Sequence, residues 1–187
     1  LLFVLLIHRY WHGRKAIWVI SVQPGGRWRY LLICFVVAAA VLNVVMWLMR
    51  GGNMAWQASQ PDWAIYLALI LITSPLQAAA EEFFFRGYLQ QAIGSLAGRA
   101  WVGVACSSLV FAIFHQNVAL FAHRLGFGLI AGTLVWATGG LEAAIAVHVA
   151  NNVFAFGYAL FTGGVATLKA TSAISWEAAC SDLAGFA

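Results

Sequence analysis

The chain has 187 residues, of which 63% are hydrophobic and 9% are charged, and its net charge at pH 7 is +4. Soluble domains contain about 25% charged residues, so this composition excludes an ordinary soluble domain and indicates a polytopic membrane protein. The length fits one bundle of helices rather than several domains, and we predict an all-α fold. Three widely separated cysteines predict neither a disulfide framework nor a Cys-rich metal site: Cys34, Cys106 and Cys180.

Residues 1–29 combine part of an apolar segment with a basic flank. The sequence starts inside an apolar stretch, and we expect the natural protein to extend before Leu1. Basic residues that flank a membrane helix mark its cytoplasmic side. A nucleic-acid partner is not expected, because these residues border an aromatic-rich membrane segment. Five of the ten basic residues fall in this flank: Arg9, Arg14, Lys15, Arg27 and Arg29.

Residues 30–49 are the first predicted transmembrane helix, because about 20 apolar residues cross about 30 Å of hydrocarbon. Glycine, asparagine and proline between residues 51 and 62 predict an external loop. The next apolar run, 63–80, predicts a second transmembrane helix that continues to about residue 92. Residues 94–99 then predict a short cytoplasmic connection, because they contain two glycines and a basic residue.

Three further apolar segments follow, and we expect residues 63–162 to form the functional core. The segments cover residues 101–114, 121–138 and 141–161. Small residues in the middle segment allow helices to approach closely. Residues 163–187 are predicted to be a tail without recognisable chemistry.

Two adjacent carboxylates, Glu81 and Glu82, end an uncharged run of membrane length. An ionisable group at membrane depth costs about 2.5–3.5 kcal/mol on insertion scales and is usually functional. Arg86 lies four residues after Glu82, so these two side chains share one helix face and are predicted to form an ion pair. Glu81 is rotated by about 100° from Glu82 and points elsewhere. This separation favours Glu81 as a general base.

Polar residues also interrupt the later apolar segments. His148 and Asn152 are one helical turn apart and present two hydrogen-bond donors to the same point, which suits an oxyanion. His115 follows Phe111 by four residues, and His123-Arg124 is interpreted as facing lipid headgroups. Each residue alone also fits a structural role, such as an interhelical hydrogen bond. Glu81 and Glu82 lie in one apolar segment, whereas His115 and the pair of His148 and Asn152 lie in two others. The combination of these residue types predicts a hydrolytic site.

These residues resemble the three motifs of the CAAX protease and bacteriocin-processing (CPBP, or Abi) family of intramembrane endopeptidases. Glu-Glu-x-x-x-Arg occupies residues 81–86, Phe-x-x-x-His residues 111–115 and His-x-x-x-Asn residues 148–152. The resemblance extends over about residues 63–160. It implies a transmembrane helix bundle with a polar intramembrane catalytic cavity, located in the bacterial plasma membrane. The implied partner is a membrane-associated peptide or membrane protein, of prenylated CAAX type or bacteriocin type. Membrane lipid is the other expected partner.

The resemblance also implies a role for each matching residue. Glu81 corresponds to the base that activates water, and His115 to a residue that helps to hold that water. His148 and Asn152 correspond to the residues that stabilise the tetrahedral oxyanion. The supporting positions are Glu82 and Arg86.

Three alternatives remain open. The first is a metal-dependent protease in which Glu81, His115 and His148 bind Zn²⁺ or a similar ion. We favour a mechanism without a cofactor, because the sequence has no His-Glu-x-x-His motif. The second is a non-catalytic immunity or scaffold protein of the same fold. The third is a proton-coupled transporter, which we rank last because the sequence lacks paired repeats.

Overall fold

A computed structural model describes residues 1–13, 15, 17–22, 25–50, 61–113, 117–162, 176, 179, 180 and 183. In this part of the chain all regular elements are helical, and extended pairing is limited to one isolated antiparallel bridge between Ser21 and Gly140. The all-α prediction is therefore confirmed. The elements are α1 (Leu2–Leu6), the π-helix η1 (Ile7–Trp11), α2 (Ile17–Ile20), α3 (Trp28–Arg50), α4 (Trp63–Glu82), the π-helix η2 (Phe83–Leu89), α5 (Gln90–Ala97), α6 (Ala100–Ala112), α7 (Val118–Thr138) and α8 (Glu142–Thr162).

Four helical segments are long and apolar enough to cross a membrane, as the hydrophobic runs predict. They are Trp28–Leu48, Trp63–Ala97, Val118–Thr138 and Glu142–Thr162. The intervening α6 has 13 residues and is therefore about 20 Å long, which is less than the hydrocarbon thickness. Most of the predicted tail, 163–187, lies outside the described residues.

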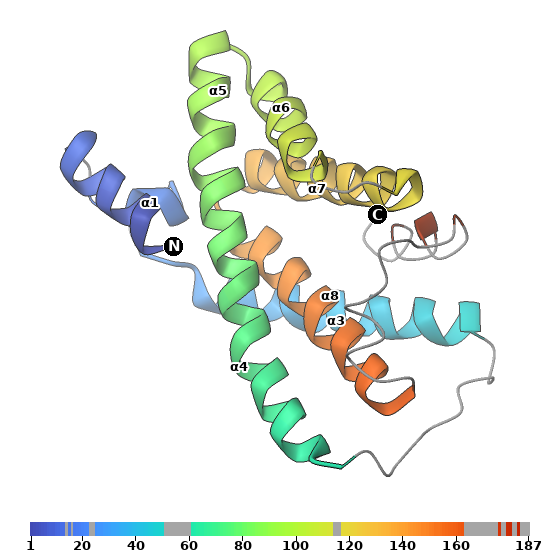
Figure 1. Ribbon diagram of the computed structural model, residues 1–187. Helices are drawn as coiled ribbons and strands as arrows, with labels where there is room; N and C mark the ends of the chain where they lie inside the picture. Colours follow the sequence, from blue (N-terminus) through green and yellow to red (C-terminus); the bar gives the residue numbers. More distant parts are fainter. Residues whose placement is uncertain are drawn as a thin grey trace.

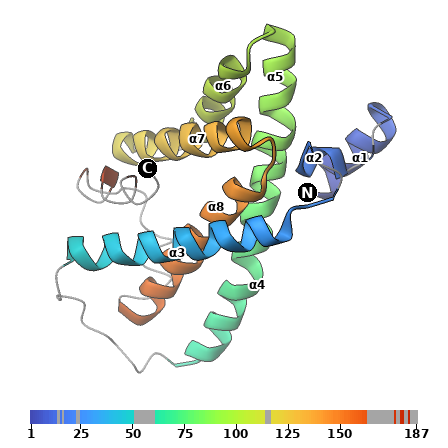
Figure 2. The same ribbon diagram turned by 180° about the vertical axis from the view of Figure 1, so that it is seen from behind.

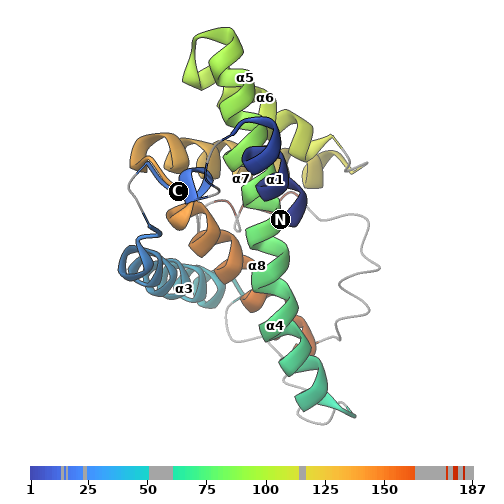
Figure 3. The same cartoon turned by 90° about the vertical axis from the view of Figure 1, so that its left-hand side faces the viewer.

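The second of these segments, Trp63–Ala97, is the longest helical segment of the bundle. α4, η2 and α5 follow one another as a single long rod, which runs through the full height of the molecule (Figures 1 and 2). α6 turns back against α5, and α7 packs on α6. α8 lies between α3 and α4 and contacts both of them (Figure 3). The rod and α8 therefore face one another near the middle of the molecule, where the polar residues of both helices occur.

The connection after α5 is shorter than predicted. Instead of starting at residue 94, it consists of Gly98, which has a positive φ of 65°, and Arg99, which precedes α6. Gly94 lies inside α5 and faces α6. A Cβ built on Gly103 of α6 would lie 2.2 Å from the main-chain oxygen of Gln90. The two glycines thus allow two backbones to approach closely, and interpreting Gly94 as a helix breaker was wrong.

This close approach gives a direct prediction. We expect Gly103→Ala to destabilise the protein by about 1–3 kcal/mol, because the added methyl group overlaps a backbone atom that cannot move independently. Gly157→Ala in α8 is the matched control, because a Cβ there would meet no atom within 4 Å. The free energy of unfolding in detergent, measured by circular dichroism, would compare the two variants. Equal stabilities would contradict the packing argument.

The segment before α3 is hydrogen-bonded to residues at the end of α7 and the start of α8. The Arg27 guanidinium donates to both carboxylate oxygens of Glu142, with Nη2–Oε2 and Nε–Oε1 distances of 2.7 and 3.2 Å. The backbone N–H of Arg27 also donates to Glu142, and Nη1 donates to the carbonyl oxygen of Thr138. The hydrogen bond to Glu142 raises the pKa of Arg27 above its ordinary value. Two backbone hydrogen bonds, Val22 to Gly139 and Leu141 to Ile20, extend this junction.

Candidate active site

The two adjacent glutamates have different environments although both lie in the last turn of α4. The Glu82 side chain is fully buried, whereas the Glu81 side chain is 30% exposed. Glu81 Oε1 accepts a hydrogen bond of 3.0 Å from Gln77, one turn earlier on the same helix. The expected separation of the two carboxylates is therefore present. Glu81 is the member of the pair that a solvent molecule or ligand can reach.

Glu82 belongs to a buried ionic cluster. Arg86 Nη1 donates to Glu82 Oε1 at 3.1 Å, so the predicted ion pair is confirmed. The Arg86 guanidinium is also completely buried, and its Cζ atom lies 4.8 Å from the centre of the Phe111 ring. Rings of Phe85 and Phe127 lie within 6 Å of the same atom. Aromatic faces attract a cation, so these rings partly replace the hydration that Arg86 loses on burial.

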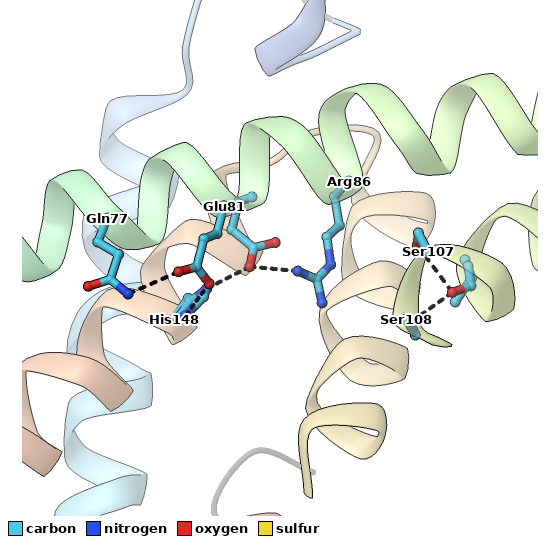
Figure 4. A network of polar contacts seen from close by, with 8 residues as sticks. Gln77, Glu81, Arg86, Ser107, Ser108 and His148 are labelled. Carbon is cyan, nitrogen blue, oxygen red and sulfur yellow. Dashed lines mark hydrogen bonds and ion pairs between the residues drawn. The ribbon is translucent and has the colours of Figure 1, made fainter. Parts of the chain in front are cut away.

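His148 of α8 contacts both glutamates. Figure 4 shows its contact with Glu81. Its Nδ1 is 2.7 Å from Glu82 Oε1, and its Nε2 is 3.7 Å from Glu81 Oε2. The ring is packed edge-on against Phe127, with ring centres 4.9 Å apart. One imidazole therefore links the buried carboxylate to the accessible one, and both its position and its orientation are fixed.

The contacts of Glu82 also determine which nitrogen of His148 carries a proton. Arg86 and His148 both approach Oε1 of Glu82, and Arg86 can only donate. When Glu82 is an ionised acceptor, His148 Nδ1 must be the protonated nitrogen. In the neutral ring, Nε2 then presents a lone pair toward Glu81. In the imidazolium, Nε2 is a second donor. His148 can thus accept a proton from water or donate one to an anion, depending on its charge.

A cavity of about 320 Å³ opens beside Glu81. Four elements besides α4 contribute to it, namely η2, α6, α7 and α8. Asn152 is 8% exposed, and its Oδ1 accepts a hydrogen bond of 3.1 Å from Asn151, which leaves its own amide group as a donor. The cavity is lined by Gln77, Glu81, Phe85, Phe111, Arg124, His148, Asn152 and Phe156.

The cavity contains three of the four residues that the motifs singled out for catalysis. Glu81, His148 and Asn152 line it together, whereas His115 lies outside the described residues. The headgroup interpretation of His123-Arg124 was wrong. His123 is 4% exposed, and Arg124 lines the cavity from the second turn of α7.

Sequence reasoning missed Gln77 as a member of the site. Its signal was available, because Gln77 is a polar residue within an apolar run and precedes Glu81 by four residues.

Two residues of potential metal-ligand type, Glu81 and His148, lie next to each other in the cavity. Glu81 Oε2 and His148 Nε2 are 3.7 Å apart, so both atoms can reach one Zn²⁺ ion at about 2.0–2.2 Å. Among the described residues, no group of three or more His, Cys, Asp or Glu could hold a metal. His115, the third ligand in the metal-dependent alternative, lies outside those residues. The described part therefore supplies two of the three ligands in that alternative.

A buried acid–base cluster lies inside a bundle of apolar helices, and ionisable groups in such a position are usually functional. Comparison with known proteins agrees. The model of the family described as type II CAAX prenyl endopeptidase Rce1-like matches residues 62–154. This chain belongs to that family, as the resemblance of its motifs implied. Four apolar helices and membership of a membrane protease family make it an integral membrane protein.

One curated relative is the Bacillus subtilis (strain 168) protein named "Uncharacterized protein YyaK". It is 29% identical over 150 residues, which represent 73% of this chain and 50% of the relative. The chain thus spans about half the length of the curated relative that it matches. No solved structure gives a significant match.

Proposed function

We propose that this protein is an intramembrane endopeptidase in which Glu81 activates water. The observation that most supports this proposal is the arrangement of the two glutamates around His148. Glu82 is buried with Arg86 and hydrogen-bonds to Nδ1 of His148. Glu81 faces the cavity and lies near Nε2 of the same ring. Fixed polar groups in a cavity walled by aromatic rings contribute more to catalysis than the same groups in water.

The proposed reaction starts with a water molecule held between the Glu81 carboxylate and the Nε2–H of a His148 ring that is an imidazolium throughout the reaction. Glu81 takes a proton as the water oxygen bonds to the peptide carbonyl carbon. The amide group of Asn152 and the His148 imidazolium donate to the oxyanion of the tetrahedral intermediate. The C–N bond then breaks, and the proton held by Glu81 passes to the departing amine. His115 is proposed to help hold the water, as its position in the motif implies.

The proposed substrate is a membrane-associated peptide. The family description names prenylated CAAX sequences, and we transfer that substrate class to this chain as part of the proposal. A bacteriocin-type precursor is the second substrate within the same reaction class. The Bacillus relative supports a bacterial plasma membrane as the location.

Hydrolysis can be tested with the purified full chain in detergent micelles. A peptide that ends in a prenylated Cys-aliphatic-aliphatic-X sequence and its unprenylated counterpart would be incubated with the protein, and products would be identified by mass spectrometry. Cleavage of either peptide supports a peptidase, and a preference for the prenylated one supports the CAAX class. A folded protein that cleaves neither peptide, nor a bacteriocin precursor, would favour the immunity or scaffold alternative.

The same assay separates the metal-free mechanism from the metal-dependent one. We propose that Glu81 acts without a metal, so incubation with a chelator followed by gel filtration should leave the rate unchanged. Loss of activity that returns with added Zn²⁺ would instead support Glu81, His115 and His148 as ligands.

A further inference from the structure

A second cavity, of about 550 Å³, lies apart from the candidate active site. In the described part of the chain it shares no lining residue with the cavity beside Glu81. Its walls come from α2 and the two residues after it, from α5 and the α5–α6 connection, and from the end of α7 with the turn that follows. Small-molecule sites typically have volumes of about 300–1,000 Å³, so this cavity is large enough for a ligand.

The walls of this cavity come from two segments that are predicted to be cytoplasmic. One is the basic flank, residues 1–29, and the other is the α5–α6 connection. α2, which belongs to the flank, packs against η2 beside the rod (Figure 2). The packing is close, because a Cβ built on Gly87 would lie 2.7 Å from Cγ1 of Val19. The cavity is therefore bounded by packed elements on the predicted cytoplasmic side of the bundle.

Arg99 gives this cavity a positive charge. It is the ionisable residue among the described lining residues, and its guanidinium forms no ion pair within the described part of the chain. Glu142 follows the lining residue Leu141, but Arg27 donates to both of its carboxylate oxygens. Arg99 is therefore available for an anion, and its planar fork of donors matches the oxygens of a phosphate group.

Two tryptophans add an apolar, membrane-interface character to the same cavity. Trp18 of α2 and Trp136 of α7 both line it, and these residues are 46% and 60% exposed. Indole rings are enriched at the level of lipid headgroups, because one end is apolar and the other carries an N–H donor. The fitting ligand therefore combines an anionic group for Arg99 with an apolar part for the two rings.

We propose that this cavity binds the headgroup of an anionic phospholipid from the cytoplasmic leaflet. Arg99 holds the phosphate, and Trp18 and Trp136 lie beside the glycerol and the upper part of the acyl chains. Anionic lipids are concentrated in that leaflet, and basic pockets between membrane helices on that side bind their headgroups. The proposal does not depend on the proposed peptidase function, because the two cavities have separate described linings.

Lipid binding to the purified full chain in nonionic detergent tests the proposal. Native mass spectrometry would give dissociation constants for phosphatidylglycerol and for phosphatidylcholine with the same acyl chains. We expect the anionic lipid to bind about fivefold more tightly, which is what one basic residue near a membrane surface contributes. An excess of inorganic phosphate should not displace it, because phosphate has no apolar part. Displacement by phosphate would indicate a site for a free anion and would overturn the lipid assignment.

Variants then assign the preference to the cavity. In Arg99→Gln the ratio of the two dissociation constants should fall toward one, whereas Arg99→Lys should keep part of it. Arg29→Gln is the matched control and should leave the ratio unchanged. It removes the same charge from an exposed position in the first turn of α3, which is not among the described lining residues.

A further variant tests the cavity itself without changing its charge. Ser95 is an exposed lining residue of α5, so Ser95→Trp fills the cavity and keeps Arg99. It should weaken the binding of both lipids. Unchanged binding in Ser95→Trp would place the lipid elsewhere. A wild-type ratio near one, or equal effects of Arg99→Gln and Arg29→Gln, would likewise overturn the proposal.

Discussion

Replacement of Glu81 by glutamine is expected to lower kcat by about 10²–10⁴-fold while leaving the protein as stable as the wild type. The loss follows from removing a general base, which typically contributes a factor of this size. Stability should be retained because the Glu81 side chain is 30% exposed and glutamine keeps an oxygen that can accept the hydrogen bond from Gln77. Steady-state cleavage of the best peptide substrate, together with thermal unfolding in detergent, would measure both quantities.

Glu82→Gln is the matched control for that variant, because it makes the same chemical change at the neighbouring residue. Glu82 is fully buried and accepts a hydrogen bond from Arg86, so its neutral replacement leaves a buried guanidinium without a counter-charge. We therefore expect Glu82→Gln to reduce both stability and activity. If Glu81→Gln retained full activity, Glu81 would not be the base, and the proposed mechanism would be wrong.

Replacement of Arg86 by methionine is expected to destabilise the folded protein by about 3–5 kcal/mol. The change removes one partner of an ion pair in which both side chains have no exposed surface, and it leaves the Glu82 charge buried beside His148. It also removes the cation stacked on Phe111. Equilibrium unfolding in detergent, followed by circular dichroism, would give the change in free energy.

The double variant Glu82→Gln with Arg86→Met provides the second half of this test. Removing both charges should recover part of the lost stability, so that the double variant is more stable than the sum of the two single changes predicts. Arg99→Met is the control, because Arg99 is exposed at the end of the rod, and we expect its effect to stay within about 0.5 kcal/mol. Additive single changes, or a small effect of Arg86→Met, would show that the ion pair contributes little.

Much of the fold follows from the one-dimensional pattern of the chain. Apolar runs of membrane length predict helices, and the helices lie where those runs occur. The ion pair between Glu82 and Arg86 was also predictable, because a spacing of four residues already determines which helix face the side chains share. Local spacing works in these cases because the interacting atoms belong to one continuous helix.

Features that depend on packing between helices were not predictable in the same way. Gly94 continues its helix because α6 approaches it closely, and nothing in the local sequence distinguishes this role from that of a helix breaker. Arg124 lines the cavity because α7 crosses the bundle near α8, although a basic residue near a helix end ordinarily faces headgroups. The π-helix Phe83–Leu89 directly after the two glutamates also had no recognised signal, although such segments are frequent at functional sites.

The junction between Arg27 and Glu142 has a consequence for the biosynthesis of this protein. Its two residues are 115 positions apart, and α3, which follows Arg27 directly, packs mainly against α8. During translation, α3 is therefore made long before its main neighbour. Contacts between such distant segments form late, after the intervening chain has been ordered. Since α8 also carries His148 and Asn152, a chain synthesised only as far as α7 has Glu81 but lacks these two cavity residues, and the proposed hydrolysis therefore requires α8.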